Sequence, residues 1–183
     1  MTTTRQFLTT LISAIALQAA LHPMAAAQAS SDPDLITPAE ARAMKQQSGP
    51  AVVFIDVRSR VEAAMRGTAA GVDYVVPYRE LAHPVRWDSA RSTLAMEPNA
   101  AFVSQVQAAM KAQGATNDTP ILLLCASGTR AAHAAAELRQ AGFRRVFVIG
   151  GGLDGSASLP GWRAAGEPTV ASADEDQIFG LGD

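Results

Sequence analysis

Three apolar runs of strand length stand out along the chain. They cover residues 51–55, 121–124 and 146–149, and a shorter run at 74–76 is a fourth candidate strand. A run that is apolar at every position, without alternation, is typical of a strand buried on both faces, as in a parallel sheet. We therefore expect these segments to lie side by side in the interior.

Helical patterns separate the runs. The segment 37–40, Thr-Pro-Ala-Glu, has the form of a capping box with proline at the first helical position and predicts a helix to about residue 47. Asn99 can cap a second helix that ends at Gly114, and a third is expected over about 129–141. Buried strands that alternate with amphipathic helices predict an α/β fold, a parallel β-sheet flanked by helices on both faces.

The remaining segments set the expected boundaries. Residues 30–34 resemble a flexible leader, 35–168 would form the single folded domain, and 169–183 resemble a mobile acidic tail. Residues 78–98 contain helix-breaking prolines and predict no regular element. A length of 183 residues suits one domain better than two.

Residues 1–29 have the pattern of a secretory signal peptide. Arg5 is the only charge in the first 31 residues, an apolar stretch covers 7–21, and a small-residue segment ends at Ala29. The alternative is a permanent membrane anchor, but about 15 residues is short for a span of roughly 20. We predict cleavage after Ala29, an exported, periplasmic protein and no stable membrane anchor.

Overall charge and ligand-type residues exclude some classes of function. A net charge of −2 argues against a nucleic-acid surface, which normally needs a basic stripe. The chain has one cysteine, and after cleavage it would keep two histidines, His83 and His133. These are too few for a structural zinc site, so we expect no metal and no cofactor. Both histidines are interpreted as surface residues.

Cys125 is the strongest candidate for chemistry. A lone cysteine cannot form an internal disulfide, so in an exported protein it is either a small buried hydrophobe or a functional thiol. It directly follows a predicted buried strand, at the point where parallel sheets gather ligands. The small residues after it can curl so that backbone N–H groups form an anion cradle, and Arg130 adds positive charge. Such surroundings favour a nucleophilic thiolate. The loop residues are Ala126, Ser127, Gly128, Thr129 and Arg130.

Several motifs in order resemble the rhodanese-homology family. The segment 56–58, Asp-Val-Arg, with Glu62 four residues after Arg58, resembles a family motif that follows the first core strand. Residues 125–130 match its six-residue C-x-x-G-x-R loop. The carboxyl-terminal match consists of Gly151, Gly152, Trp162, Gly166 and Pro168. The resemblance covers about residues 35–168 and implies a rhodanese-like fold.

This resemblance also implies an activity, that of a thiosulfate sulfurtransferase. Cys125 would attack the outer sulfur of thiosulfate, release sulfite and hold a persulfide within the loop amides. A thiol, cyanide or an exported protein would then accept the sulfur, which predicts ping-pong kinetics. Residues 126–130 and Arg58 would bind the anionic donor, with Asp56 and Glu62 in support. Arg58 could instead form a structural ion pair with Asp56, and Glu62 could lie on a solvated helix face.

Two other functions remain open. The domain could be a persulfide relay or binding module for one partner, with negligible turnover on small acceptors. Cysteine phosphatases and arsenate reductases use a loop with five residues between cysteine and arginine, whereas four separate Cys125 from Arg130 here, so these are less favoured. The chain also departs from the family pattern at 67–72, where a common histidine is absent, and at 78–98, which is longer and could shape the site's mouth.

Overall fold

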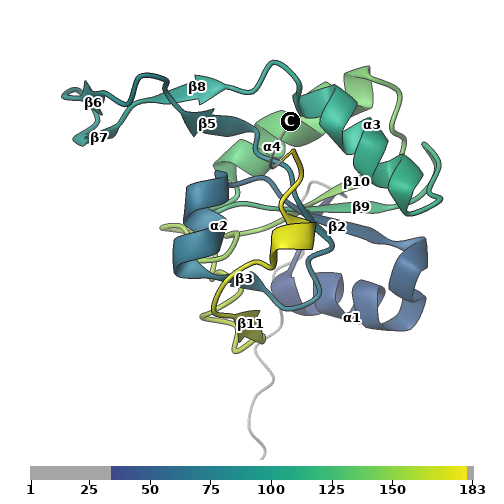
Figure 1. Ribbon diagram of the computed structural model, residues 1–183. Helices are drawn as coiled ribbons and strands as arrows, with labels where there is room; N and C mark the ends of the chain where they lie inside the picture. The colour runs from purple at the N-terminus through teal and green to yellow at the C-terminus, as the bar shows by residue number, and fades with distance from the viewer. Residues whose placement is uncertain (1–33, 181–183) are drawn as a thin grey trace, which may run out of the picture.

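A five-stranded parallel sheet forms the centre of the protein. The computed structural model describes residues 34–180, and its sheet has the strand order β1-β10-β9-β2-β4 with every neighbouring pair parallel (Figure 1). Its strands are β1 (Leu35–Ile36), β2 (Val53–Asp56), β4 (Tyr74–Val75), β9 (Ile121–Leu124) and β10 (Val146–Ile149). The three apolar runs therefore form the three central strands, as the sequence predicted.

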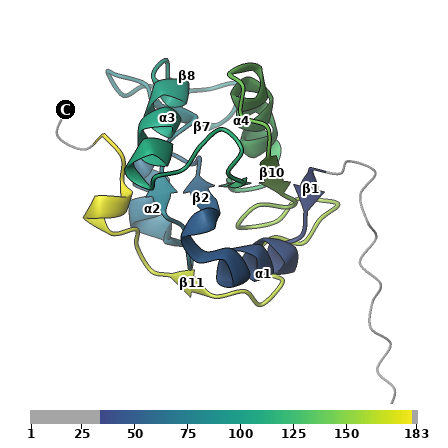
Figure 2. The same cartoon turned by 90° about the vertical axis from the view of Figure 1, so that its right-hand side faces the viewer.

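Helices cover both faces of this sheet. Helices α3 (Phe102–Ala112) and α4 (Thr129–Gln140) lie over one face, and α1 (Pro38–Ser48) lies over the other (Figure 2). Helix α2 (Arg60–Arg66) lies beyond the carboxyl end of β2. The predicted α/β fold with a parallel sheet between helices is confirmed.

The core consists of two layers, because successive side chains of each strand point to opposite faces of the sheet. Alternate residues such as Ile55 and Leu123 pack with α3 and α4, while Phe54 and Leu122 between them pack on the α1 side. The Phe54 and Trp162 rings on that side are 5.5 Å apart. Both faces of β2 and β9 are fully buried, so neither strand has a solvent-facing side for alternate polar residues. This explains why their sequences are continuous apolar runs.

Helix ends agree with the predictions in one case and differ in another. At α1, the Thr37 and Glu40 side chains form the predicted reciprocal capping box. At α3, Ala101 rather than Asn99 occupies the N-cap position. The Asn99 side chain accepts a hydrogen bond from the Ala101 amide and donates one to the Pro77 carbonyl, so it closes the preceding turn instead.

The segment for which the sequence predicted no regular element forms two short antiparallel strand pairs, which together project as an arm. We define the arm as residues 79–98. Strand β5 (Arg79–Leu81) pairs antiparallel with β8 (Met96–Pro98), and β6 (Trp87–Asp88) pairs with β7 (Thr93–Leu94) toward the tip. Figure 1 shows the arm extending away from the sheet beside α2. Strands this short carry too little apolar alternation to be recognised from sequence.

The carboxyl-terminal segment differs from the expected mobile tail. Strand β11 (Thr169–Val170) pairs with β3 (Thr68–Ala69), and a short 3-10 helix covers Glu175–Gln177. Ile178 then forms a parallel bridge with Val75. This packing shows that residues 169–180 belong to the folded body. A short 3-10 turn, Gly49–Ala51, precedes β2.

The predicted signal peptide lies outside the described residues. Within residues 34–180, no helix is both long and apolar enough to cross a membrane.

Candidate active site

Cys125 lies where β9 ends and its loop begins. It continues the strand's alternation toward the α4 side, and its side chain is 1% exposed. Its Sγ accepts hydrogen bonds from the amides of Gly128, at 3.1 Å, and Ala131, at 3.4 Å. Two backbone amides therefore converge on this one sulfur atom.

The loop is curled by one left-handed residue. Gly128 has φ 95°, a conformation that other residues rarely adopt, and is the N-cap of α4. Two carbonyl groups of the loop accept hydrogen bonds from the carboxyl-terminal loop instead of facing Sγ. Cys125 O accepts from the Leu153 amide at 2.7 Å, and Ala126 O accepts from the Asp154 amide at 2.8 Å. With the carbonyls held outside, the amides are left for the site.

Four further amides of the loop are unpaired. In the part of the chain that the structure describes, no protein acceptor contacts the backbone N–H groups of Ala126, Ser127, Thr129 and Arg130. Unpaired amides at the start of a helix, close to a buried sulfur, form a ready site for an anion. The predicted cradle therefore has donors to spare.

Gly152 allows the carboxyl-terminal loop to approach the Cys125 loop. A Cβ atom at this position would lie 2.3 Å from the Cys125 carbonyl oxygen. Gly152 also has φ 59°, in the left-handed region. No side chain fits there, so the glycine that the sequence matched to the family motif has a direct steric role.

Arg130 is held by Glu62 rather than left free. Its Nη1 and Nη2 donate to the two carboxylate oxygens at 2.6 and 2.7 Å. Burial alone raises the pKa of Glu62, but the hydrogen bonds and charge of Arg130, together with Ser59, lower it to about 2. Glu62 in turn holds the pKa of Arg130 above its usual range against the effect of burial, with a smaller contribution from Cys125. Both groups are therefore charged at neutral pH.

Local sequence explains why Glu62 is in position. Ser59 is the N-cap of α2, and its side chain and backbone amide form a reciprocal capping box with Glu62. The carboxylate thus caps its own helix and binds Arg130 at once. From the sequence, Glu62 was predicted either to support the site or to lie on a solvent-exposed helix face. The capping pattern at 59–62 was the signal that could have fixed it.

Arg58 lies in a buried ion pair instead of facing solvent. Its guanidinium donates to both Asp56 oxygens, and both side chains are 0% exposed. The Arg58 guanidinium also donates to the Gly67 carbonyl, and the Thr68 hydroxyl donates to Asp56 at 2.6 Å. We expected Arg58 to help attract the donor. The structure corrects this: a guanidinium with no exposed surface cannot meet a dissolved anion, and its contacts match the structural ion pair.

The remaining candidates lie apart from the loop chemistry. His83 and His133 are exposed, and Trp162 is buried, with its Nε1 donating to the Pro168 carbonyl at 2.7 Å. Among residues 34–180, no group of three histidine, cysteine, aspartate or glutamate side chains is placed to hold a metal ion.

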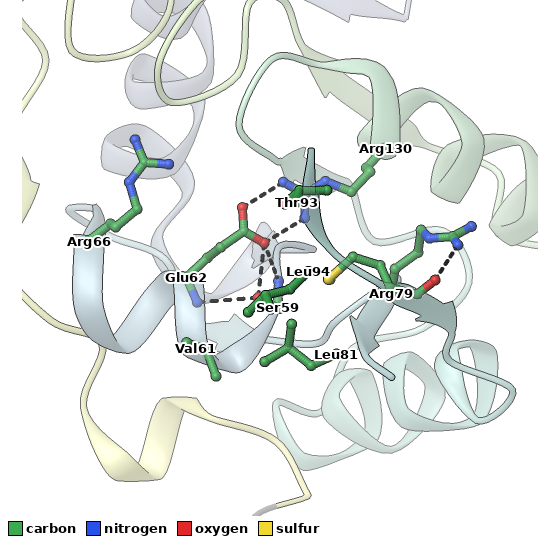
Figure 3. Close-up of a pocket in the computed structure, with 10 residues that line it drawn as sticks. Ser59, Val61, Glu62, Arg66, Arg79, Leu81, Thr93, Leu94 and Arg130 are labelled. Atoms are coloured by element: carbon green, nitrogen blue, oxygen red, sulfur yellow. Dashed lines mark hydrogen bonds and ion pairs between the residues drawn. The ribbon is translucent and has the colours of Figure 1, made fainter. Parts of the chain in front are cut away.

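A pocket of about 440 Å³ lies beside Arg130. Figure 3 shows the Glu62–Arg130 pair on its wall and Arg79 on the arm, where its guanidinium donates to the Met96 carbonyl. The arm was not recognised as a site element from sequence beyond the suggestion that it could shape the mouth. It does border the pocket, through Arg79, Leu81 and Leu94.

The fold and the loop define a class of protein: an α/β domain that presents one cysteine at the start of a loop between a central strand and a helix. A family model described as a rhodanese-like domain matches residues 37–158. The chain therefore belongs to the rhodanese-like domain family, as its motifs indicated.

Solved structures show the same fold. The Rv0390 protein of M. tuberculosis is 24% identical with a TM-score of 0.54, over 75% of this chain and 97% of that one. The rhodanese-like domain of an Anabaena protein is 19% identical with a TM-score of 0.51, over 79% and 89%. A thiosulfate sulfurtransferase from Pseudomonas aeruginosa is 18% identical with a TM-score of 0.54, over 81% of this chain and 22% of that one. No curated protein sequence matches.

Proposed function

We propose that this protein is a sulfurtransferase that carries sulfane sulfur on Cys125. The Cys125 thiolate attacks the outer sulfur of thiosulfate or a related donor. The sulfur–sulfur bond of the donor breaks, and sulfite leaves with its electron pair. A thiol, cyanide or protein acceptor then takes the outer sulfur and restores the thiolate. This two-step covalent route gives ping-pong kinetics.

One observation carries the proposal: the Cys125 sulfur lies within a loop that has more amide donors than acceptors. Two amides already contact Sγ, and four more in the loop have no protein acceptor among the described residues. A persulfide anion extends one atom beyond Sγ and needs donors at that distance. Membership of the rhodanese-like family and likeness to sulfurtransferase folds support the same chemistry.

The ion pair at Arg130 changes how an anionic donor is held. Because Glu62 already balances the guanidinium, the donor does not meet a free positive charge there. Backbone amides and the amino-terminal end of α4 then supply most of the attraction. We expect modest affinity for thiosulfate that depends on close hydrogen bonds more than on long-range charge.

The test is the intact mass of the purified protein before and after thiosulfate, beside Cys125→Ser. A gain of one sulfur atom that the serine variant lacks supports the persulfide. If the reduced protein gains no sulfur from thiosulfate or from an organic persulfide, the proposal is wrong. Cys125→Ser is a suitable control because the serine hydroxyl fits the site and cannot form a persulfide.

A partner-specific relay is a second candidate. Cys125 is almost fully buried, which favours an acceptor that docks closely over one that collides freely. A relay would gain sulfur in a single turnover yet release little to cyanide in the steady state. Measuring both rates on the same preparation separates the two functions.

We also propose that the protein acts outside the cytoplasm, on the strength of the signal-peptide pattern of residues 1–29. Fractionation of cells that express the full chain tests this. Mature protein that begins after Ala29 in the periplasmic fraction supports export, whereas full-length protein in the cytoplasm contradicts it.

A further inference from the structure

Helix α2 packs on the carboxyl-terminal part of the chain, and we call residues 169–180 the strap. The helix buries a single residue, Ala63. That residue forms a small apolar cluster with Val75 of the sheet and with Ala173 and Ile178 of the strap. The Ala173 amide also donates to the Ala63 carbonyl at 3.3 Å. The buried face of α2 therefore depends on the strap.

The strap also contacts both ends of α2. Arg60 is the first residue of the helix, and its Nε and Nη2 donate to the Phe179 carbonyl at 3.1 and 2.7 Å. Gly67 follows the last residue and lies so close to the strap that a Cβ atom there would be 2.0 Å from the Val170 carbonyl oxygen. The strap thus holds the helix at its start, its middle and its end.

Arg60 joins the strap to the arm as well. Its Nη1 donates to the carboxylate of Glu80 on β5, and the two side chains are 23% and 25% exposed. A guanidinium has five N–H donors in a rigid fork, so it can bind a carbonyl and a carboxylate at the same time. A lysine at this position would keep the charge but could not reproduce the same set of contacts.

The position of α2 matters because the helix carries Glu62. The two oxygens of Glu62 accept from Arg130, beside the loop of Cys125, at 2.6 and 2.7 Å. A shift of α2 by about 1 Å would lengthen both bonds beyond the usual hydrogen-bond range. The charge of Arg130 is therefore balanced only while α2 stays in place.

We infer that Arg60 is a positioning residue and that the strap is a clamp, and that together they hold α2 where Glu62 balances Arg130. The inference rests on the proposed sulfurtransferase function. With the clamp closed, an anionic donor relies on the backbone amides of the loop. With the clamp loosened, Arg130 is free to attract the donor. The strap lies outside residues 37–158, which match the family model, so the clamp is an addition to the matched part of the domain.

The first measurement is the rate of hydrogen exchange at the backbone amides of α2. Arg60→Lys keeps the charge and removes the fork, and Ile178→Ala removes packing against Ala63. We expect both substitutions to speed exchange in α2 about tenfold, because they favour local opening of this helix. Val170→Ala is the matched control, since this side chain is in the strap but is 40% exposed and outside the cluster.

Two results of the exchange measurement would overturn the inference. Unchanged protection of α2 in Arg60→Lys and Ile178→Ala would show that the strap does not hold the helix. Exchange that rises equally in α2 and in the central strand β9 would show that the substitutions only destabilise the whole domain. The inference requires a change confined to α2 and its neighbours.

The second measurement is the steady-state kinetics with thiosulfate at low salt. Arg60→Lys and Ile178→Ala should each lower KM several-fold and leave kcat nearly unchanged, because the released Arg130 attracts the anion. In a protein that already carries Glu62→Gln, neither substitution should lower KM further. A fall in KM that persists beside Glu62→Gln, or a fall in kcat alone, would contradict the positioning role.

The two measurements separate this inference from the proposed function. Hydrogen exchange needs no sulfur chemistry. Faster exchange in α2 of a protein that gains no sulfur from thiosulfate or an organic persulfide would contradict the function and leave the clamp in place. Normal sulfur loading with unchanged exchange in the variants would contradict the clamp and leave the function.

Discussion

Glu62 and Arg130 join the first turn of α2 to the first turn of α4 through two hydrogen bonds of 2.6 and 2.7 Å. A cation at a helix amino terminus is unfavourable, because the helix dipole is positive there. A carboxylate at the same kind of position is favourable. The pair therefore uses the stabilised Glu62 to offset the charge of Arg130 beside the reactive loop.

Replacing Glu62 by glutamine should release this balance. The side-chain amide introduced by Glu62→Gln would face an Arg130 N–H group donor to donor, so the free energy of unfolding should fall by about 1–3 kcal/mol. The uncompensated guanidinium should also attract thiosulfate, so its KM should fall several-fold at low salt and return toward the wild-type value as salt is added. Denaturant unfolding and steady-state kinetics measure the two effects. A KM that is insensitive to the substitution at low salt would contradict this role.

The stability contributed by the pair should depend on acid pH. Since the folded-state pKa of Glu62 is lowered to about 2, the stabilisation is present in full above the ordinary value of 4.5. It should be lost as pH falls from about 4.5 toward 2, because the unfolded chain then binds the proton more readily. The difference in unfolding free energy between wild type and Glu62→Gln, measured across this range, should shrink with falling pH. A constant difference would show that charge is not its source.

Arg58→Met should destabilise the domain by about 3–5 kcal/mol, because it leaves the Asp56 carboxylate buried without its partner. Chemical denaturation measures the loss. The double variant Asp56→Leu/Arg58→Met should recover part of it, since no buried charge remains. If Arg58→Met keeps wild-type stability and instead weakens thiosulfate loading, the original interpretation of Arg58 as a donor-binding residue is the right one.

Gly152→Ala should disrupt the loop that carries Cys125. The new methyl group would meet the Cys125 carbonyl oxygen, and the backbone has φ 59°. A cost of about 3 kcal/mol or more is expected, with slower alkylation or sulfur loading of Cys125. Gly114→Ala is the control, because Gly114 has φ 69° but nothing within 4 Å of a Cβ. It should cost about 1–2 kcal/mol. Similar losses for the two variants would mean that the steric contact is unimportant.

The central layers of this fold could be predicted from sequence because their signals are local. Continuous apolar runs marked β9 and β10 at their observed bounds, and the capping box marked the start of α1. Strand β1 was missed because two residues carry no pattern. The packed segment after 168 was also missed, because its contacts to Val75 and Arg60 join residues more than a hundred positions apart.

The candidate site shows the same division. The Cys125 loop could be identified because its residues are contiguous and the strand before it fixes its place. The partner of Arg130 could not, since it depends on where α2 places Glu62, and for Arg58 the sequence left donor binding and an ion pair with Asp56 both open. Arg58 and Glu62 are only four positions apart, yet one is enclosed with Asp56 and the other reaches α4. The arm's contribution to the pocket depends on the direction in which the arm projects. The sequence of such short strands does not determine that direction.

The bridge between Ile178 and Val75 has a consequence for solubility. Strand β4 is the outer strand on its side of the sheet, and the carboxyl-terminal segment lies along it: the Phe179 amide donates to the Val75 carbonyl at 3.1 Å. An uncovered strand edge is a template for pairing with a second molecule. Ile178 and Phe179 thus cover part of this edge, and we expect a variant that lacks them to present an open strand edge to its neighbours.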